Sequence, residues 1–201
     1  MTLDELFLRR AAVSAGALIY WGGVAVHARR IRKRIGKSAN LKPRTPKEKL
    51  LWLGWTFMIL GWLVQPLWIS NAALPATLLT PATLALGLAL TLLGYGCTLW
   101  CYAAMGDMWR IGVNRDEKTS LVTRGPYNFV RHPIYGFQIV MLAGAALLLP
   151  TFFSLALIAV HFLCVQTKAD DEEAYLLGVH GETYRAYLHR TGRLFPKFFR
   201  A

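Results

Sequence analysis

Two long stretches of the chain carry no charged side chain. The first runs for 57 residues from Leu50 to Gly106, and the second runs for 35 residues from Pro133 to Thr167. A helix that crosses the hydrocarbon core of a bilayer needs roughly 20 apolar residues, so the first stretch alone can hold two spans. Only 17% of the 201 residues are charged, whereas soluble domains contain about 25%. The sequence therefore predicts an integral membrane protein.

The apolar segments predict an all-α membrane bundle of about five transmembrane helices. The expected spans are residues 6–27, 50–70, 82–105, 134–149 and 151–167, within a single domain of residues 1–201. Arg9 and Arg10 interrupt the start of the first span. Pro150 separates the last two spans into a tight hairpin, because a proline after an apolar run ends a helix. Each of these two spans is near the lower length limit for crossing a bilayer.

The charges that remain are clustered, and they predict an orientation. Ten basic residues lie between residues 28 and 49: Arg29, Arg30, Arg32, Lys33, Arg34, Lys37, Lys42, Arg44, Lys47 and Lys49. Short basic loops between apolar spans stay in the cytoplasm, so we expect the lipid bilayer as a partner and no nucleic acid. Five spans then place residues 106–133 and 168–201 on the same cytoplasmic side. We expect a multi-pass protein of the bacterial inner membrane.

The segment GPYNFVRHPIY, from Gly125 to Tyr135, is the first dense polar motif. Pro133 suits the first turn of a helix, where its missing N–H group is not needed. The free N–H groups of that turn make an anion site, and Arg131 would be a charged partner for a bound carboxylate. The alternative interpretation is that Arg131 and His132 are an interfacial pair without a ligand.

Four consecutive carboxylates, from Asp170 to Glu173, form the second polar motif. A membrane hairpin returns the chain to the surface that it left, so this acidic run is expected to meet the segment 125–135. One or two of the carboxylates could bind an ammonium group or ribose hydroxyls. The alternative is a solvated helix face, on which Lys168 and Glu172 form an ion pair at i, i+4 spacing. The two motifs together predict a site for a polar cofactor beside the lipid, facing the cytoplasm.

The other candidate residues indicate less. Cys97, Cys101 and Cys164 lie in apolar stretches, so we expect buried thiols, no disulfide and no metal. His161 is expected to be a packed core residue rather than part of the site. The tail around residues 182–188 has a helical pattern, and it would be either an interfacial helix or a lid over the site.

The motifs occur in a specific order along the chain: GPYNFVRHPIY, the uncharged hairpin, the acidic run, and then GETYRAY from Gly181 to Tyr187. This combination resembles the integral-membrane isoprenylcysteine carboxyl methyltransferases, whose pattern the phospholipid and small-thiol methyltransferases share. The resemblance covers about residues 106–196. Members of the family bind S-adenosyl-L-methionine in a cytoplasm-facing pocket closed by the tail. The resemblance thus implies an S-adenosyl-L-methionine-dependent methyltransferase of class EC 2.1.1, with residues 106–201 as its catalytic, cofactor-binding half.

The resemblance also implies roles for individual residues. Those that match the family's cofactor contacts are Leu121, Val122, Tyr127, Arg131, His132, Pro133, Ile134, Glu172 and Glu173. Leu121 and Val122 match the adenine side of the pocket. Tyr127, Arg131 and His132 are the residues expected nearest to the reaction, and His132 is the candidate base for an acceptor that must lose a proton.

The acceptor is expected to be a lipophilic or small molecule that reaches the site from the membrane. Lys168 stands where the eukaryotic prenylcysteine enzymes have a substrate-facing arginine, and Thr119 stands where they have a histidine. These differences leave the identity of the acceptor open. Five spans around a cofactor-sized cavity are compatible with a monomer. Two other functions stay open: an NADPH-dependent membrane reductase of sterol-like lipids, and a non-enzymatic membrane adaptor.

Overall fold

The computed structural model describes residues 3–36, 43, 45–69, 73–109 and 120–197. The long helices are α1 (Leu3–Ile35), α2 (Pro46–Trp68), α3 (Pro81–Met105), α4 (Pro133–Leu148), α5 (Phe152–His180) and α6 (Glu182–Arg190). Short 3-10 helices connect them: η2 (Ala76–Leu78), η3 (Gly106–Met108) and η4 (Gly125–Asn128). Within these ranges there is no β-strand, and the predicted all-α membrane bundle is confirmed.

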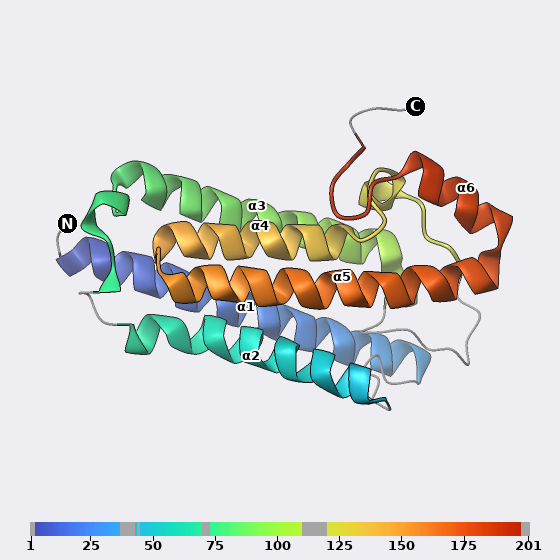
Figure 1. The fold of residues 1–201 in the computed structure, drawn as a ribbon, viewed down its shortest axis with the longest axis horizontal. Helices are drawn as coiled ribbons and strands as arrows, with labels where there is room; N and C mark the ends of the chain where they lie inside the picture. The colour runs from blue at the N-terminus through green and yellow to red at the C-terminus, as the bar shows by residue number, and fades with distance from the viewer. Residues whose placement is uncertain (1–2, 37–42, 44, 70–72, 110–119, 198–201) are drawn as a thin grey trace.

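Four of these helices, α1, α2, α3 and α5, are long and apolar enough to cross a membrane. The helix α4 is apolar but has only 16 residues. At a rise of 1.5 Å per residue it is about 24 Å long, which is less than the roughly 30 Å of a bilayer core. Figure 1 shows α4 lying alongside α3 and α5. It packs within the bundle against these two helices, and the span predicted at residues 134–149 stays a prediction.

Proline marks the start of three helices, as expected from its fixed backbone angle and missing N–H group. Pro46 and Pro81 each follow a threonine whose hydroxyl accepts a hydrogen bond from the backbone N–H three residues later. The third of these prolines, Pro133, follows His132 and begins α4 directly after the polar loop. Because α4 begins at Pro133, the polar loop before it lies at the end of the bundle.

The polar segments gather at one end of the bundle, as predicted. Figure 1 shows η4, α6 and the carboxyl ends of α1 and α5 at the end opposite the amino terminus. Several residues named above lie outside the part of the chain that the structure describes: Lys37, Lys42, Arg44 and Thr119.

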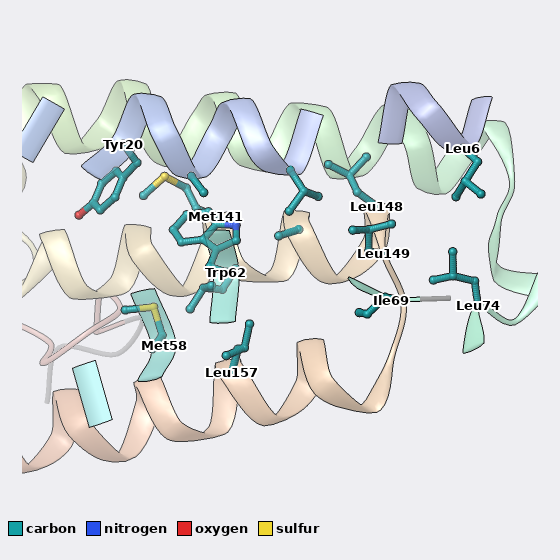
Figure 2. Packing of buried hydrophobic residues seen from close by; sticks show 14 of the residues in the cluster. Leu6, Tyr20, Met58, Trp62, Ile69, Leu74, Met141, Leu148, Leu149 and Leu157 are labelled. Atoms are coloured by element: carbon teal, nitrogen blue, oxygen red, sulfur yellow. The ribbon is translucent and has the colours of Figure 1, made fainter. Parts of the chain in front are cut away.

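The core between the helices is made of large apolar side chains. Figure 2 shows Trp62 between Met141 and Leu157, and all three are buried. The contact between α3 and α4 is close because glycines line it. A Cβ atom at Gly94 would lie 2.8 Å from the Phe137 carbonyl oxygen, so only glycine fits there.

At the amino-terminal end, arginines that seemed to interrupt the first span hold several helix ends together. Arg9 is fully buried, pairs with Glu5 at 3.0 Å, and donates hydrogen bonds to the carbonyls of Leu147 and Thr80. Arg10 donates to the carbonyl of Pro66 at 3.0 Å. The last carbonyls of a helix have no partner within the helix. The two guanidinium groups supply a partner to the carbonyls of Leu147 in α4 and Pro66 in α2, and the helix that carries them, α1, begins at Leu3, before the predicted span.

Candidate active site

The loop before α4 and the chain after α6 lie side by side. The backbone N–H groups of Arg131 and His132 donate to the carbonyls of Gly192 and Arg193 at 2.9 and 3.0 Å, and the N–H of Gly192 donates to the Phe129 carbonyl at 3.0 Å. Val130 and Gly192 form an isolated parallel bridge. The tail therefore closes over the loop. These two N–H groups precede α4 and are engaged by the chain's own carbonyls, whereas the anion site expected at the N–H groups of the first turn of α4 stays a prediction.

The two motifs meet at Glu173, near the carboxyl end of α5. Its Oε1 atom accepts from Arg131 Nε at 2.9 Å, and its Oε2 atom accepts from Arg193 Nη2 at 2.8 Å. His132 Nε2 lies 3.2 Å from the same Oε1 atom. Charge-assisted contacts of this kind are the strong ones. Glu173 therefore joins the loop, α5 and the tail.

The neighbouring acid, Glu172, has different partners. Its Oε1 atom accepts from the Tyr135 hydroxyl at 3.0 Å, and its Oε2 atom lies 3.3 Å from His132 Nδ1. No arginine contacts this carboxylate among the ion pairs of the described residues. Glu172 is thus the acid with more capacity to bind a cationic or hydroxyl-bearing ligand.

His132 lies between the two carboxylates and is 7% exposed. Burial alone would lower the pKa of the imidazole, but the hydrogen bonds and charges of Glu172 and Glu173 outweigh it and raise the pKa above its ordinary 6.5. A ring with an acceptor at each nitrogen favours the protonated form, because both nitrogens then donate. The site thus favours a histidinium that bridges the two acids.

Arg131 is tied to the tail as well as to Glu173. Its Nη1 atom donates to the carbonyl of Leu188 at 3.3 Å and to the carbonyl of Thr191. These carbonyls belong to the last turn of α6 and to the residue that follows it. A cation at the carboxyl end of a helix is favourable. Arg131 therefore anchors α6, and its binding of a ligand carboxylate stays a prediction.

Tyr127 lies in an apolar cluster that connects the loop to α3. It is 7% exposed and packs with Cys101, Val122 and Ile134. Its carbonyl accepts from the Tyr187 hydroxyl at 2.6 Å, which links the loop to α6 a second time. Burial raises the pKa of the Tyr127 phenol, so it is neutral at ordinary pH.

Beside this cluster, Leu121 and Val122 line a cavity of about 270 Å³. The residues that share it are Met105, Met108, Ser120, Thr123 and Arg124. Pockets for small ligands usually have about 300–1,000 Å³, so this cavity suits one part of a nucleoside-bearing ligand. It lies where the adenine side of the cofactor was expected.

Other expected residues take simpler positions. Pro133 begins α4, and Lys168 is a half-buried residue of α5 one turn before Glu172. The alternative of a solvated acidic face holds for the first two acids only in part, because Asp171 pairs with Lys47 at 2.6 Å and Asp170 pairs with Arg193 at 2.7 Å. Both contacts join segments that are far apart in the sequence.

The sequence analysis missed three residues of this site: Tyr135 as a partner of Glu172, Arg193 as a partner of Glu173, and Tyr184. Tyr184 is 1% exposed, and its hydroxyl has no hydrogen-bond partner within the described ranges. The spacing of Tyr184 and Tyr187 showed a common helix face, but not what that face covers. Arg193 follows α6 in a segment without periodicity, so no pattern could have placed it.

Comparison with known proteins finds a family model, described as phospholipid methyltransferase, that matches residues 82–183, half of the chain. The match includes α3 from its second residue, the segment between α3 and α4, all of α4 and α5, and the start of α6. A curated relative is the nickel-cobalt-cadmium resistance protein NccN of Alcaligenes xylosoxydans xylosoxydans, 28% identical over 96 residues. That similarity covers 47% of this chain and 45% of the relative, so the chain matches less than half of the relative's length.

Proposed function

Because this chain belongs to the phospholipid methyltransferase family, and is thus a membrane methyltransferase, we propose that its methyl donor is S-adenosyl-L-methionine. We further propose that the acceptor is a lipophilic or small molecule that reaches the site from the membrane. The observation that carries the proposal is the meeting of three segments around Glu172 and Glu173, beside the cavity at Leu121 and Val122. Those segments are the loop 125–135, the end of α5 and the tail.

The residues present fit this cofactor. Glu172 offers a carboxylate for the ammonium group or the ribose hydroxyls, and the cavity at Leu121 and Val122, with its mixed polar and apolar lining, offers a place for the adenine. The buried Tyr184 hydroxyl, which has no hydrogen-bond partner among the described residues, is a second polar group suited to a ligand. When bound, the cofactor supplies an electrophilic methyl group on its sulfonium.

The chain's own contribution is to orient the reactants and exclude water. Tyr135 and His132 fix the carboxylate of Glu172 by contacts of 3.0 and 3.3 Å, so that it meets its ligand in one position. The tail, held to the loop through Gly192 and Arg193, covers the site on the aqueous side. The apolar helices on the other side give a lipophilic acceptor a path from the bilayer, with Lys168 as a contact for its polar group.

The proton balance depends on the acceptor. A carboxylate or thiolate acceptor takes the methyl group without a base, whereas an amine or thiol must lose a proton. His132 is the nearest candidate base, but its pKa is raised by Glu172 and Glu173. It can therefore accept a proton only at a pH above this raised value.

The location is also proposed. The described basic residues near the carboxyl end of α1 lie at the same end of the bundle as the site (Figure 1). Basic segments stay in the cytoplasm. This supports a protein of the bacterial inner membrane with its active site facing the cytoplasm, acting as a monomer.

The proposal is tested by calorimetric titration of the detergent-purified protein with S-adenosylhomocysteine, and with NADPH as the control ligand. We expect one saturable site for S-adenosylhomocysteine that is weakened at least about tenfold in Glu172→Gln, because a charged contact is lost. Glu182→Gln is the matched control, since Glu182 is exposed on α6 and pairs only across the surface with Arg185. It should bind as the parent does.

Other outcomes would reject the proposal. Binding of NADPH without S-adenosylhomocysteine would indicate the reductase, and binding of neither would favour the adaptor. Unchanged affinity in Glu172→Gln would remove Glu172 from the cofactor site.

A further inference from the structure

The hydroxyl oxygen of Tyr184 is a buried polar atom without a hydrogen bond in the described part of the protein. Its side chain is in α6 and is 1% exposed, and the hydroxyl makes no hydrogen bond with the described part of the protein. Buried polar side-chain atoms in native proteins nearly always have a partner, either in the protein, in water or in a ligand. The hydroxyl is therefore available to a ligand.

The surroundings of Tyr184 place it at the candidate active site. The charges of Glu173, Arg131 and Glu172 act on its hydroxyl. The centroid of its ring lies 5.8 Å from the centroid of the Tyr187 ring. Arg131 also donates to the carbonyl of Leu188, one turn further along α6. The face of α6 that carries Tyr184 is thus the face that covers the site.

Several donors around the two acids are already engaged. Arg131 contacts Glu173 and two carbonyls, and the N–H groups of Arg131 and His132 donate to the tail. Glu173 in turn accepts from Arg193 and from Arg131, so it does not need the Tyr184 hydroxyl. A carboxylate that enters the site without dislodging these contacts meets the Tyr184 hydroxyl, a donor without a hydrogen bond in the described part of the protein.

The phenol is suited to this role. Burial, followed by the charge of Glu173, raises the pKa of the Tyr184 phenol, so the hydroxyl keeps its proton over the whole physiological range. A neutral hydroxyl can donate to an anion at any such pH.

We propose that the Tyr184 hydroxyl donates a hydrogen bond to the carboxylate at the amino-acid end of the methyl donor. This inference rests on the proposed function, since it assumes a donor that carries an amino-acid end. It assigns α6 a direct part in binding and makes Tyr184 a residue that selects for the carboxylate.

The test combines a change in the protein with a change in the ligand. Binding of S-adenosylhomocysteine and of its decarboxylated counterpart, 5′-deoxy-5′-(3-aminopropylthio)adenosine, is measured by calorimetry for the parent and for Tyr184→Phe. A hydrogen bond to a charged group predicts that the substitution weakens S-adenosylhomocysteine roughly tenfold or more and leaves the decarboxylated ligand nearly unchanged. The ligand-free thermal midpoint of Tyr184→Phe should equal that of the parent, because no internal bond is lost.

Tyr187→Phe is the matched control. The Tyr187 hydroxyl has an internal partner, the Tyr127 carbonyl at 2.6 Å. This variant should lower the thermal midpoint and weaken both ligands alike. Tyr184→Phe overturns the inference if it affects both ligands equally, affects neither, or lowers the ligand-free midpoint as Tyr187→Phe does. If the parent binds no S-adenosylhomocysteine, the proposed function fails and the inference fails with it.

Discussion

At the scale of single residues, two adjacent carboxylates on one helix have separate roles. Glu173 is held by Arg131 and Arg193, and its contacts join loop, helix and tail. Glu172 contacts Tyr135 and His132 and has no arginine partner among the described ion pairs. Neighbouring positions on a helix point about 100° apart, so one acid can stabilise the site while the other faces its ligand.

His132 makes the stability of this site depend on pH. In the unfolded chain its pKa is the ordinary 6.5, and in the folded site Glu172 and Glu173 raise it. A raised folded pKa means that protonation stabilises the fold. This stabilisation is fully present below pH 6.5 or so, and it is lost as the pH rises through the higher folded value.

We expect the thermal midpoint of the detergent-solubilised parent to fall over that interval, and the midpoint of His132→Asn to fall less. His189→Asn is the control, because His189 is exposed on α6. If the thermal midpoints of the parent and of His132→Asn depend on pH in the same way, the imidazole is not linked to the two acids.

At the scale of elements, the tail packs closely against α4 because Gly136 has no side chain. The backbone of Leu194 lies in the space that a side chain would take. A Cβ atom there would lie 2.5 Å from the Leu194 carbonyl oxygen, closer than real Cβ contacts allow. We expect Gly136→Ala to displace the tail, to speed tryptic cleavage after Arg193 and Lys197, and to weaken S-adenosylhomocysteine binding.

Gly178→Ala is the control for this prediction, because a Cβ atom at Gly178 meets nothing. Its higher helix propensity should stabilise α5 by about 0.5–1 kcal/mol. Equal cleavage rates for Gly136→Ala and the parent would show that the tail does not depend on this contact.

At the amino-terminal end of the bundle, we expect a substitution of Arg9 to lower stability without changing the candidate active site. Arg9→Met leaves the carbonyl of Leu147 without its side-chain donor and removes one of the donors to the Thr80 carbonyl, which also accepts from the Leu84 N–H group. An unsatisfied buried acceptor costs about 1–3 kcal/mol, so we expect a loss of about 1–3 kcal/mol in the free energy of unfolding. It can be measured by unfolding in mixed micelles.

The folded fraction of Arg9→Met should keep the parent's affinity for S-adenosylhomocysteine, because the site lies at the opposite end. Arg29→Met, at an exposed position of the same helix, should change neither quantity. If Arg9→Met bound S-adenosylhomocysteine more weakly but unfolded with the parent's free energy, the amino-terminal end and the site would not be independent.

The elements show what sequence patterns can and cannot predict. The uncharged stretches predicted the apolar helices, and the hairpin of α4 and α5 predicted that the loop 125–135 would meet the acidic run. Arg9 looked like an interruption because its partners are carbonyls, which have no signature in a sequence. The engagement of the Arg131 and His132 N–H groups was equally hidden, since it depends on where the tail turns after α6.

At the scale of the whole molecule, the account predicts which end faces the cytoplasm. Ala186 on α6 and Ala76 in η2 are both exposed and lie at opposite ends of the bundle. In intact bacteria, a membrane-impermeant maleimide should label Ala76→Cys and should label Ala186→Cys only after permeabilisation. The parent serves as the background control, because its cysteines are buried or half-buried. The reverse pattern would place the site on the outer face.

Some features of the whole molecule could not be predicted from the sequence. The motif order predicted the family of membrane methyltransferases, and the family match confirms that the chain belongs to the phospholipid methyltransferase family. The tail's seating is a property of the assembled bundle, set by contacts between α4, α5, α6 and the loop. For this reason Tyr184 and Arg193 emerged only from the structure.

The most direct test of the account is methyl transfer in a membrane. The purified protein is reconstituted with lipids extracted from the cells that express it and given S-adenosylmethionine labelled with tritium in the methyl group. We predict label in a membrane-derived or small-molecule product, with at least about a tenfold loss in Glu172→Gln and full activity in Glu182→Gln. No transfer above the level of liposomes without the protein, in any fraction, would contradict the claim that this bundle is a methyltransferase that uses S-adenosylmethionine.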